Sequence, residues 1–273
     1  MENILFYFTF AKWGIFSGLL FGFALSFTAP ILILNKNALF PHALTHVLFL
    51  AIVLAISLDT FIPKGFNYFF IIGVTLLAMS GILFLKYILS VYEDTATSII
   101  AQIAMGIALI ITAKTSQYNA QLLSYLFGSL LTVTKNDFWK SLIIALITLV
   151  GFCKFKSLWI SQTIEKEIPG MNFKYSNLVF LIIITLQILI GIKLMGILLI
   201  STFFVLSSSI ALKLASNFNQ VILLCFILNI LGILGGSLIS VWWDVPFSGA
   251  VVIFMSLYLV LPILKALKKY ETD

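Results

Sequence analysis

The sequence predicts an all-α fold, a polytopic transmembrane helical bundle of about eight or nine spans. Of the 273 residues, 62% are hydrophobic and only 10% are charged, and the mean hydropathy is +1.16. An ordinary soluble domain is about half apolar and about a quarter charged. Since each span takes about 20 residues, the spans use up the chain, and we expect a single membrane domain over residues 1–273.

Nine apolar runs have the length of a membrane span. Charged residues, prolines and polar turns separate them and mark where a helix leaves the hydrocarbon. The predicted spans cover residues 13–34, 40–58, 67–89, 96–113, 138–153, 176–192, 194–212, 220–241 and 247–264. A further apolar segment, 118–133, is short and interrupted by Gly128. It is interpreted as a re-entrant or interfacial piece, and it leaves the span count open.

The lysines predict an orientation. They crowd the 154–175 loop and the C-terminus, at Lys154, Lys156, Lys166, Lys174, Lys265, Lys268 and Lys269. Because cytoplasmic loops carry an excess of lysine, both regions are expected inside, and counting back places the N-terminus outside. The N-terminus lacks the features of a signal peptide, so the first apolar run is expected to remain as a span. The net charge of +6 then reflects topology and not nucleic-acid binding.

Small and polar residues inside the spans predict helix packing. The first span carries a stripe at helical spacing, namely Gly14, Gly18, Gly22 and Ser26. In lipid such a stripe lets backbones approach closely, either in static packing or against a neighbour that moves. Three amides are expected to form hydrogen bonds between helices, those of Gln102, Gln187 and Asn229.

The two histidines of the chain, His42 and His46, are four residues apart at the start of an apolar run that Pro41 precedes. At about 3.6 residues per turn both imidazoles lie on one face, within reach of one metal ion. The alternative is that both have ordinary structural roles. Ionisable residues within a membrane span are scarce and usually functional, so the pair is a candidate metal site.

The 154–175 loop is the longest polar stretch. Its charged centre, Glu165 to Glu167, is followed by Pro169 and Gly170, as in a short helix that stops at Pro-Gly. It is either a docking element for a cytoplasmic partner or a solvated loop that fixes topology. The sequence contains no H-E-x-x-H, G-x-S-x-G, Walker A motif or close acid pair, so we expect no catalytic site of its own.

Three segments in order resemble the membrane permeases of zinc- and manganese-type ABC importers, and most closely the zinc-uptake permeases. Residues 124–134, SYLFGSLLTVT, are similar to the family's YLFG.LL.VT segment. Residues 191–211 are similar to a helix that ends in PAATA, although Ser207 and Ser208 stand here without its proline. Asp244-Val245-Pro246 with Ser248-Gly249 is similar to a late D.P.GP turn. The likeness runs from about residue 14 to the C-terminus.

The resemblance implies partners and a mechanism. Two copies of the permease would form a central path in the bacterial inner membrane, cytoplasmic ATP-binding subunits would dock at the 154–175 loop, and an extracytoplasmic metal-binding protein would deliver the ion. The family's Asp-x-x-x-His metal pair falls on His42 and His46, with histidine at the aspartate position. A nitrogen ligand there favours zinc over manganese, and the alternative is that only His46 contacts the metal. The alternative function is an ATP-independent transporter or channel for a metal or small solute.

Overall fold

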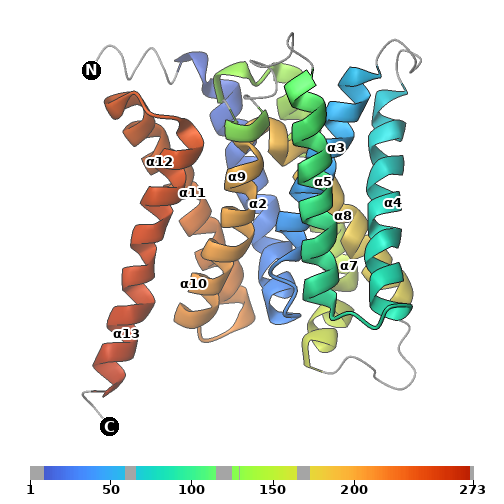
Figure 1. The fold of residues 1–273 in the computed structure, drawn as a ribbon. Helices are drawn as coiled ribbons and strands as arrows, with labels where there is room; N and C mark the ends of the chain where they lie inside the picture. The colour runs from blue at the N-terminus through green and yellow to red at the C-terminus, as the bar shows by residue number, and fades with distance from the viewer. Residues whose placement is uncertain (1–8, 59–65, 115–124, 129, 165–172, 271–273) are drawn as a thin grey trace. The chain divides into compact units, whose positions relative to one another are not determined.

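The computed structural model describes residues 9–58, 66–114, 125–128, 130–164 and 173–270. Every regular element in these ranges is helical, and nine helices are long and apolar enough to cross a membrane. The prediction of a polytopic helical bundle is therefore confirmed. The chain divides into two compact units, residues 37–126 and the remainder, and Figure 1 shows the path of the chain through the helices of each.

Unit 1, residues 1–36 and 127–273, is built around helix α2 (Lys12–Leu34). This helix is mostly buried and packs on α7 (Lys135–Ile164), α8 (Phe173–Met195), α10 (Ser208–Leu214) and α11 (Phe218–Trp243). The chain ends in α12 (Phe247–Ser256), the short 3-10 turn η3 (Leu257–Leu259) and α13 (Val260–Tyr270). Helix α12 packs on α11, and α13 packs on α10.

Unit 2, residues 37–126, contains α3 (Phe40–Ser57), α4 (Asn67–Tyr87) and α5 (Glu93–Lys114). Helix α3 packs on both α4 and α5, and α4 packs on α5. The core of α3 consists of aliphatic and aromatic side chains such as Leu44, Leu48 and Phe49. Transfer of one such side chain from water into the protein interior stabilises the fold by about 1.5–3 kcal/mol. The gain is smaller when the side chain leaves lipid, so close packing of complementary surfaces holds the three helices together.

The structure corrects the end of the fifth span, predicted at residue 153. Helix α7 continues to Ile164, so the first half of the predicted 154–175 loop is helical. Trp159 explains the continuation: it is 1% exposed, its indole N–H donates to the carbonyl of Ser176 at 3.0 Å, and its ring packs on Phe180 of α8. These contacts stabilise the helix beyond the lysines that mark the span end in the sequence.

The span predicted at 194–212 is broken into pieces. Gly196 alone separates α8 from α9 (Ile197–Thr202), with a φ of 77°, a left-handed conformation that glycine adopts at little cost. A π-helical turn, η2 (Phe203–Ser207), then joins α9 to α10. Since π turns inside helices are rare, no regular 3.6-residue pattern could have predicted this one.

The segment before α7 does not form a spanning helix in its described part. Residues 125–127 form one helical turn, Gly128 has a φ of 66°, and η1 (Leu130–Thr132) is a single 3-10 turn. A side-chain carbon on Gly128 would collide with the backbone of Met195. The glycine of the YLFG motif thus allows the backbone at residue 128 to lie close to the junction of α8 and α9.

Two lysines at one end of unit 1 form hydrogen bonds to neighbouring helices. Lys156 donates to the amide oxygen of Asn219 at 3.1 Å, and Lys265 donates to the carbonyls of Lys213 and Leu214, both at 3.0 Å, at the end of α10. A cation at a helix C-terminus also meets the negative end of the helix dipole. The assignment of this end to the cytoplasm stays a prediction.

Candidate metal centre

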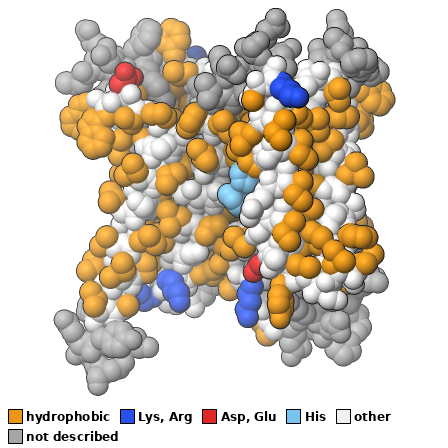
Figure 2. All heavy atoms as spheres, in the orientation of Figure 1, with side chains coloured by type: hydrophobic (Ala, Val, Ile, Leu, Met, Phe, Trp, Pro, Cys, Tyr) orange, Lys and Arg blue, Asp and Glu red, His pale blue; other side chains and the backbone are white. Residues whose placement is uncertain are grey.

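The candidate centre lies in the first turns of α3. Pro41 stands at the helix start, where its missing N–H costs no helical hydrogen bond. The hydroxyl of Thr45 donates to the carbonyl of His42 at 2.6 Å. The side chain of His42 is exposed and that of His46 is half-buried, and histidine atoms are visible from outside in Figure 2, in pale blue.

The two imidazoles meet through their Nε2 atoms. These nitrogens are 3.2 Å apart, and the ring centroids are 4.4 Å apart with an interplanar angle of 84°. In the absence of a metal this distance suits a hydrogen bond from one Nε2–H to the other nitrogen. The two histidines lie on one helix face, as predicted, and this places their Nε2 atoms next to each other.

The distance between the nitrogens also suits two bonds to one metal ion. Zinc–nitrogen bonds of about 2.0–2.1 Å at a tetrahedral angle hold two nitrogens about 3.3 Å apart. Both imidazoles would then be neutral, with their remaining proton on Nδ1. The change from a mutual hydrogen bond to metal ligation requires both rings to rotate about their side-chain torsions.

The support behind the pair is weak. The Nδ1 atom of His46 is buried and has no hydrogen-bond partner, whereas a ligating histidine in a permanent metal site almost always donates its second N–H to an acceptor. In the part of the chain that the structure describes, no group of three or more His, Cys, Asp or Glu side chains lies together. Two imidazole nitrogens whose tautomers are not fixed by hydrogen bonds suit a site that binds an ion transiently. They do not suit a permanent structural metal site.

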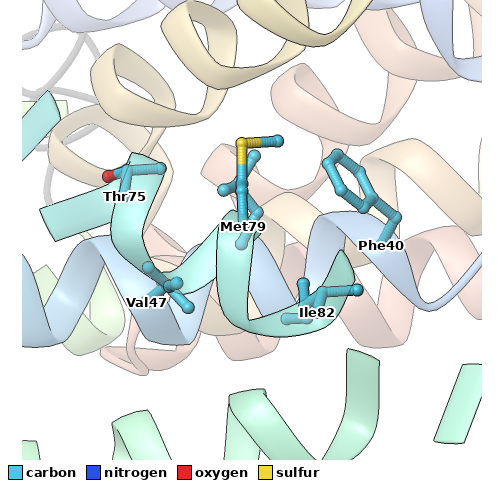
Figure 3. A pocket seen from close by; sticks show the side chains of 8 residues that line it. Phe40, Val47, Thr75, Met79 and Ile82 are labelled. Carbon is cyan, nitrogen blue, oxygen red and sulfur yellow. The ribbon is translucent and has the colours of Figure 1, made fainter. Parts of the chain in front are cut away.

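A small pocket lies on a neighbouring face of α3. It is lined by residues of α3 and α4, namely Phe40, Ala43, Leu44, Val47, Thr75, Ala78, Met79 and Ile82, of which Figure 3 labels five. The hydroxyl of Thr75 donates to the carbonyl of Ile71 in its own helix. The lining offers no charged or imidazole ligand, so the pocket is not a candidate for an ion.

The glycine stripe of α2 meets three neighbours within unit 1. A side-chain carbon on Gly14 would collide with the carbonyl of Leu130 in η1. One on Gly18 would lie 3.5 Å from both Ile233 of α11 and Met195 of α8, and one on Gly22 would lie 3.0 Å from Asn229 of α11. Glu165, Glu167, Pro169 and Gly170 of the predicted docking loop lie outside the described residues.

Two of the three amides predicted to bond between helices do so. The amide nitrogen of Gln187 in α8 donates to the hydroxyl of Thr148 in α7 at 3.0 Å and to the carbonyl of Ala24 in α2 at 3.3 Å. Its oxygen accepts from Thr28 at 2.9 Å. Asn229 donates to the carbonyl of Gly22 at 3.0 Å. Gln102 in α5 is exposed instead.

An ion pair at the start of α7 was missed. Lys193 of α8 lies 2.7 Å from Asp137 Oδ2, which also accepts from the backbone N–H and the hydroxyl of Thr134 at 2.9 and 2.7 Å. The pattern Thr134-x-x-Asp137 is a capping signal and agrees with the place of Asp137 just before the span predicted at 138–153. Nothing in the sequence indicated the lysine, which lies 56 residues further on.

A buried polar cluster around Cys225 was also missed. The thiol lies 3.4 Å from the hydroxyl of Ser207 and 3.7 Å from that of Ser208, and the amide nitrogen of Asn229 donates to it at 3.8 Å. Ser207 donates to the carbonyl of Phe203 at 2.6 Å. The cluster joins the π turn η2 to α11 by contacts far apart in the sequence.

Comparison with known proteins gives a consistent result. The family model described as "ABC 3 transport family" matches residues 7–266. The chain is 29% identical over 254 residues to the high-affinity zinc uptake system membrane protein ZnuB of Buchnera aphidicola, covering 89% of this chain and 94% of that protein. It is 24% identical to the manganese transport system membrane protein MntC of Listeria monocytogenes, covering 87% and 84%.

A solved structure has the same fold. A chain of PsaBC from Streptococcus pneumoniae, determined in complex with Fab, matches with a TM-score of 0.84 over 96% of this chain and 94% of that chain. The sequence identity between the two is 16%, so this likeness concerns the fold alone.

Proposed function

Because this chain belongs to the ABC 3 transport family, we propose that it is the permease subunit of an importer that carries a divalent metal ion into the cell. A partner subunit hydrolyses ATP, and the permease itself carries out no covalent chemistry. The cargo is zinc in preference to manganese. The whole chain, residues 1–273, forms one membrane domain of the bacterial inner membrane.

One observation carries the proposal, the 3.2 Å separation of the Nε2 atoms of His42 and His46. Two convergent imidazole nitrogens in a chain with so few ionisable residues form a ligand pair for a borderline-soft cation. The names of the relatives, a zinc uptake and a manganese transport membrane protein, agree with a metal cargo. His46 contributes the more buried ligand and His42 the more accessible one.

The ligand chemistry separates the two metals. Imidazole suits zinc and the later transition metals, whereas carboxylate and carbonyl oxygens suit manganese. With nitrogen at both positions the site favours zinc. Two protein ligands leave the remaining positions to water or to another chain, and this keeps the ion weakly bound, as transport requires.

The proposed assembly contains two permease copies, cytoplasmic ATP-binding subunits and an extracytoplasmic metal-binding protein. The ATP-binding subunits contact the segment between α7 and α8, with Glu165, Glu167, Pro169 and Gly170 in the contact. ATP binding and hydrolysis then alternate the path between outward and inward openings. The glycines at 14, 18 and 22 provide the close packing that α2 needs in this assembly.

The driving force is tested by zinc uptake with and without the cognate ATP-binding subunit. Cells that express the chain, the ATP-binding subunit and the binding protein accumulate radioactive zinc, and we expect accumulation to fall to background when the ATP-binding subunit is absent or unable to hydrolyse ATP. Uptake that is independent of that subunit would replace the importer with an ATP-independent transporter or channel.

The site is tested by replacing both histidines with alanine. We expect the His42→Ala, His46→Ala variant to lose at least about 90% of zinc uptake, because no nitrogen ligand remains at this point. Gln102→Ala is the matched control, since Gln102 is a polar, exposed side chain in the same unit and should leave uptake unchanged. Normal uptake by the double variant, at equal membrane abundance, would remove the histidines from the path.

A further inference from the structure

Helix α11 presents a stripe of large apolar side chains on its exposed face. Leu223, Ile227, Leu231 and Leu238 are 57, 40, 47 and 44% exposed, at intervals of one or two helical turns. The stripe ends at Trp242, which is 82% exposed, and the adjacent Trp243 is 70% exposed. These are the last two residues of the helix.

Another side of α11 packs on protein. Side-chain carbons on Gly232 and Gly236 would collide with Met255 and Val251 of α12. Gly235, next to the stripe, marks its edge, since a side-chain carbon there would collide with Phe254 of α12. Helix interfaces in membranes use small residues for such close approaches. The exposed positions of the stripe carry large apolar side chains, which is typical of a surface that faces lipid.

The length of the stripe matches a bilayer. Leu223 and Trp242 are 19 residues apart, which at about 1.5 Å per residue corresponds to about 28 Å along the helix axis. The hydrocarbon core of a bilayer is about 30 Å thick. Exposed polar residues, Asn219 and Gln220, precede the stripe, and Asp244 follows the tryptophans. If the stripe spans the hydrocarbon, both tryptophans lie where hydrocarbon gives way to lipid headgroups.

We propose that Trp242 and Trp243 are an interfacial anchor that binds the ester and headgroup region of the bilayer. Each ring buries its apolar body at the edge of the hydrocarbon, and each indole N–H donates to an ester carbonyl or phosphate oxygen of a lipid. The anchor fixes the depth at which α11 lies in the membrane.

Hydrogen bonds in the turn after the anchor couple the position of α12 in the membrane to that of α11. Asp244 has a φ of 49°, and Val245 donates its N–H to the carbonyl of Ser240 at 3.2 Å. The hydroxyl of Ser240 in turn donates to the carbonyl of Val245 at 2.7 Å. These bonds connect the last turn of α11 to the start of α12, so the two helices keep one depth.

The test uses tryptophan fluorescence of the full chain in bilayers of brominated phospholipid. The reference variant replaces Trp13, Trp139, Trp242 and Trp243 with Phe and keeps only Trp159, which is 1% exposed and bonded to Ser176. Two further variants restore Trp242 or Trp243 alone. The probes are lipids with bromine close to the ester group, lipids with bromine close to the chain end, and aqueous iodide.

We expect lipids brominated close to the ester group to quench the restored tryptophans about two-fold more strongly than lipids brominated at the chain end. Trp159 in the reference variant should respond little to any probe. Strong quenching by iodide with little by either lipid would make the pair a surface for a soluble partner and overturn the proposal. So would resistance to all three probes, since a second copy of the chain would then cover the rings.

Discussion

The two units of the chain use polar side chains in different ways. In unit 1 they connect helices: Gln187 joins α8 to α2 and α7, Asn229 joins α11 to α2, and Asp137 pairs with Lys193. Hydroxyls bond within their own helices in both units, as those of Thr75 in unit 2 and Thr185 in unit 1 do, but in unit 2 the two histidines meet each other.

Under the proposed function, this difference separates polar side chains that hold the fold from those that bind the cargo. A hydrogen bond between helices fixes their register, because in lipid a buried polar group without a partner is costly. The imidazoles of unit 2 hold no helix pair together, so their nitrogens are available to an ion. Substitutions in unit 1 should therefore lower stability, and substitutions of the histidines should change transport at constant stability.

The largest expected effect on stability comes from Gly128→Ala in unit 1. Gly128 has positive φ and lies against the backbone of Met195, so a methyl group there forces the 125–133 segment away from the junction of α8 and α9. We expect a loss of about 3 kcal/mol, measured as a lower midpoint of thermal unfolding in detergent. The control is Gly106→Ala in α5, where a side-chain carbon meets nothing within 4 Å.

Gly106→Ala should have the opposite sign, because alanine is a better helix former than glycine by about 1 kcal/mol. If Gly128→Ala and Gly106→Ala lowered the unfolding midpoint equally, the two units would not differ in how closely their glycines are packed.

The next effect in size is that of Asp137→Ala. The substitution removes the carboxylate that accepts hydrogen bonds from Thr134 at the N-terminus of α7, and it leaves the ammonium of Lys193 without its carboxylate. The side chain of Lys193 is 41% exposed, so solvent reduces the cost of the unpaired charge, and we expect a total loss of about 2 kcal/mol. Lys193→Met in the same background should restore part of the unfolding midpoint. A double variant no more stable than Asp137→Ala alone would show that the cap carries the whole effect.

A smaller effect is expected for Gln187→Leu. Bonds between membrane helices are worth about 0.6 kcal/mol on average, and this side chain makes three, so we expect a loss of about 1–2 kcal/mol. The matched control is Gln102→Leu, the same substitution at an exposed position of unit 2, which should change stability by less than about 0.5 kcal/mol. Equal losses at the two positions would mean that polar bonds between helices do not distinguish unit 1.

The helices themselves were predictable, because hydrocarbon imposes a length and a composition that each apolar run shows on its own. The end of α7 was not, because the contact of Trp159 with Ser176 is tertiary and the lysines before it resemble a loop. The π turn η2 and the approach of Gly128 to Met195 likewise depend on contacts across the fold.

The candidate site was predictable in part for the same reason. The four-residue spacing of His42 and His46 follows from helix geometry, so their common face could be derived from the sequence. The separation of their Nε2 atoms depends on side-chain rotamers, and the buried, unpartnered Nδ1 of His46 depends on the packing around α3. Metal ligands supplied by water or by another chain could not be predicted from residue spacing in this sequence.

His42→Asp is expected to have the smallest effect on stability and the largest effect on metal preference. His42 is exposed, so the fold should be unchanged within about 0.5 kcal/mol. An anionic oxygen in place of a neutral nitrogen favours manganese relative to zinc. Uptake of radioactive zinc in competition with manganese measures the preference, and we expect manganese to compete about ten-fold more effectively in the variant. His46→Asp is the companion variant, in which the more buried ligand changes instead. An unaltered metal preference in both variants would place selectivity outside this pair, and unit 2 would then differ from unit 1 in packing alone.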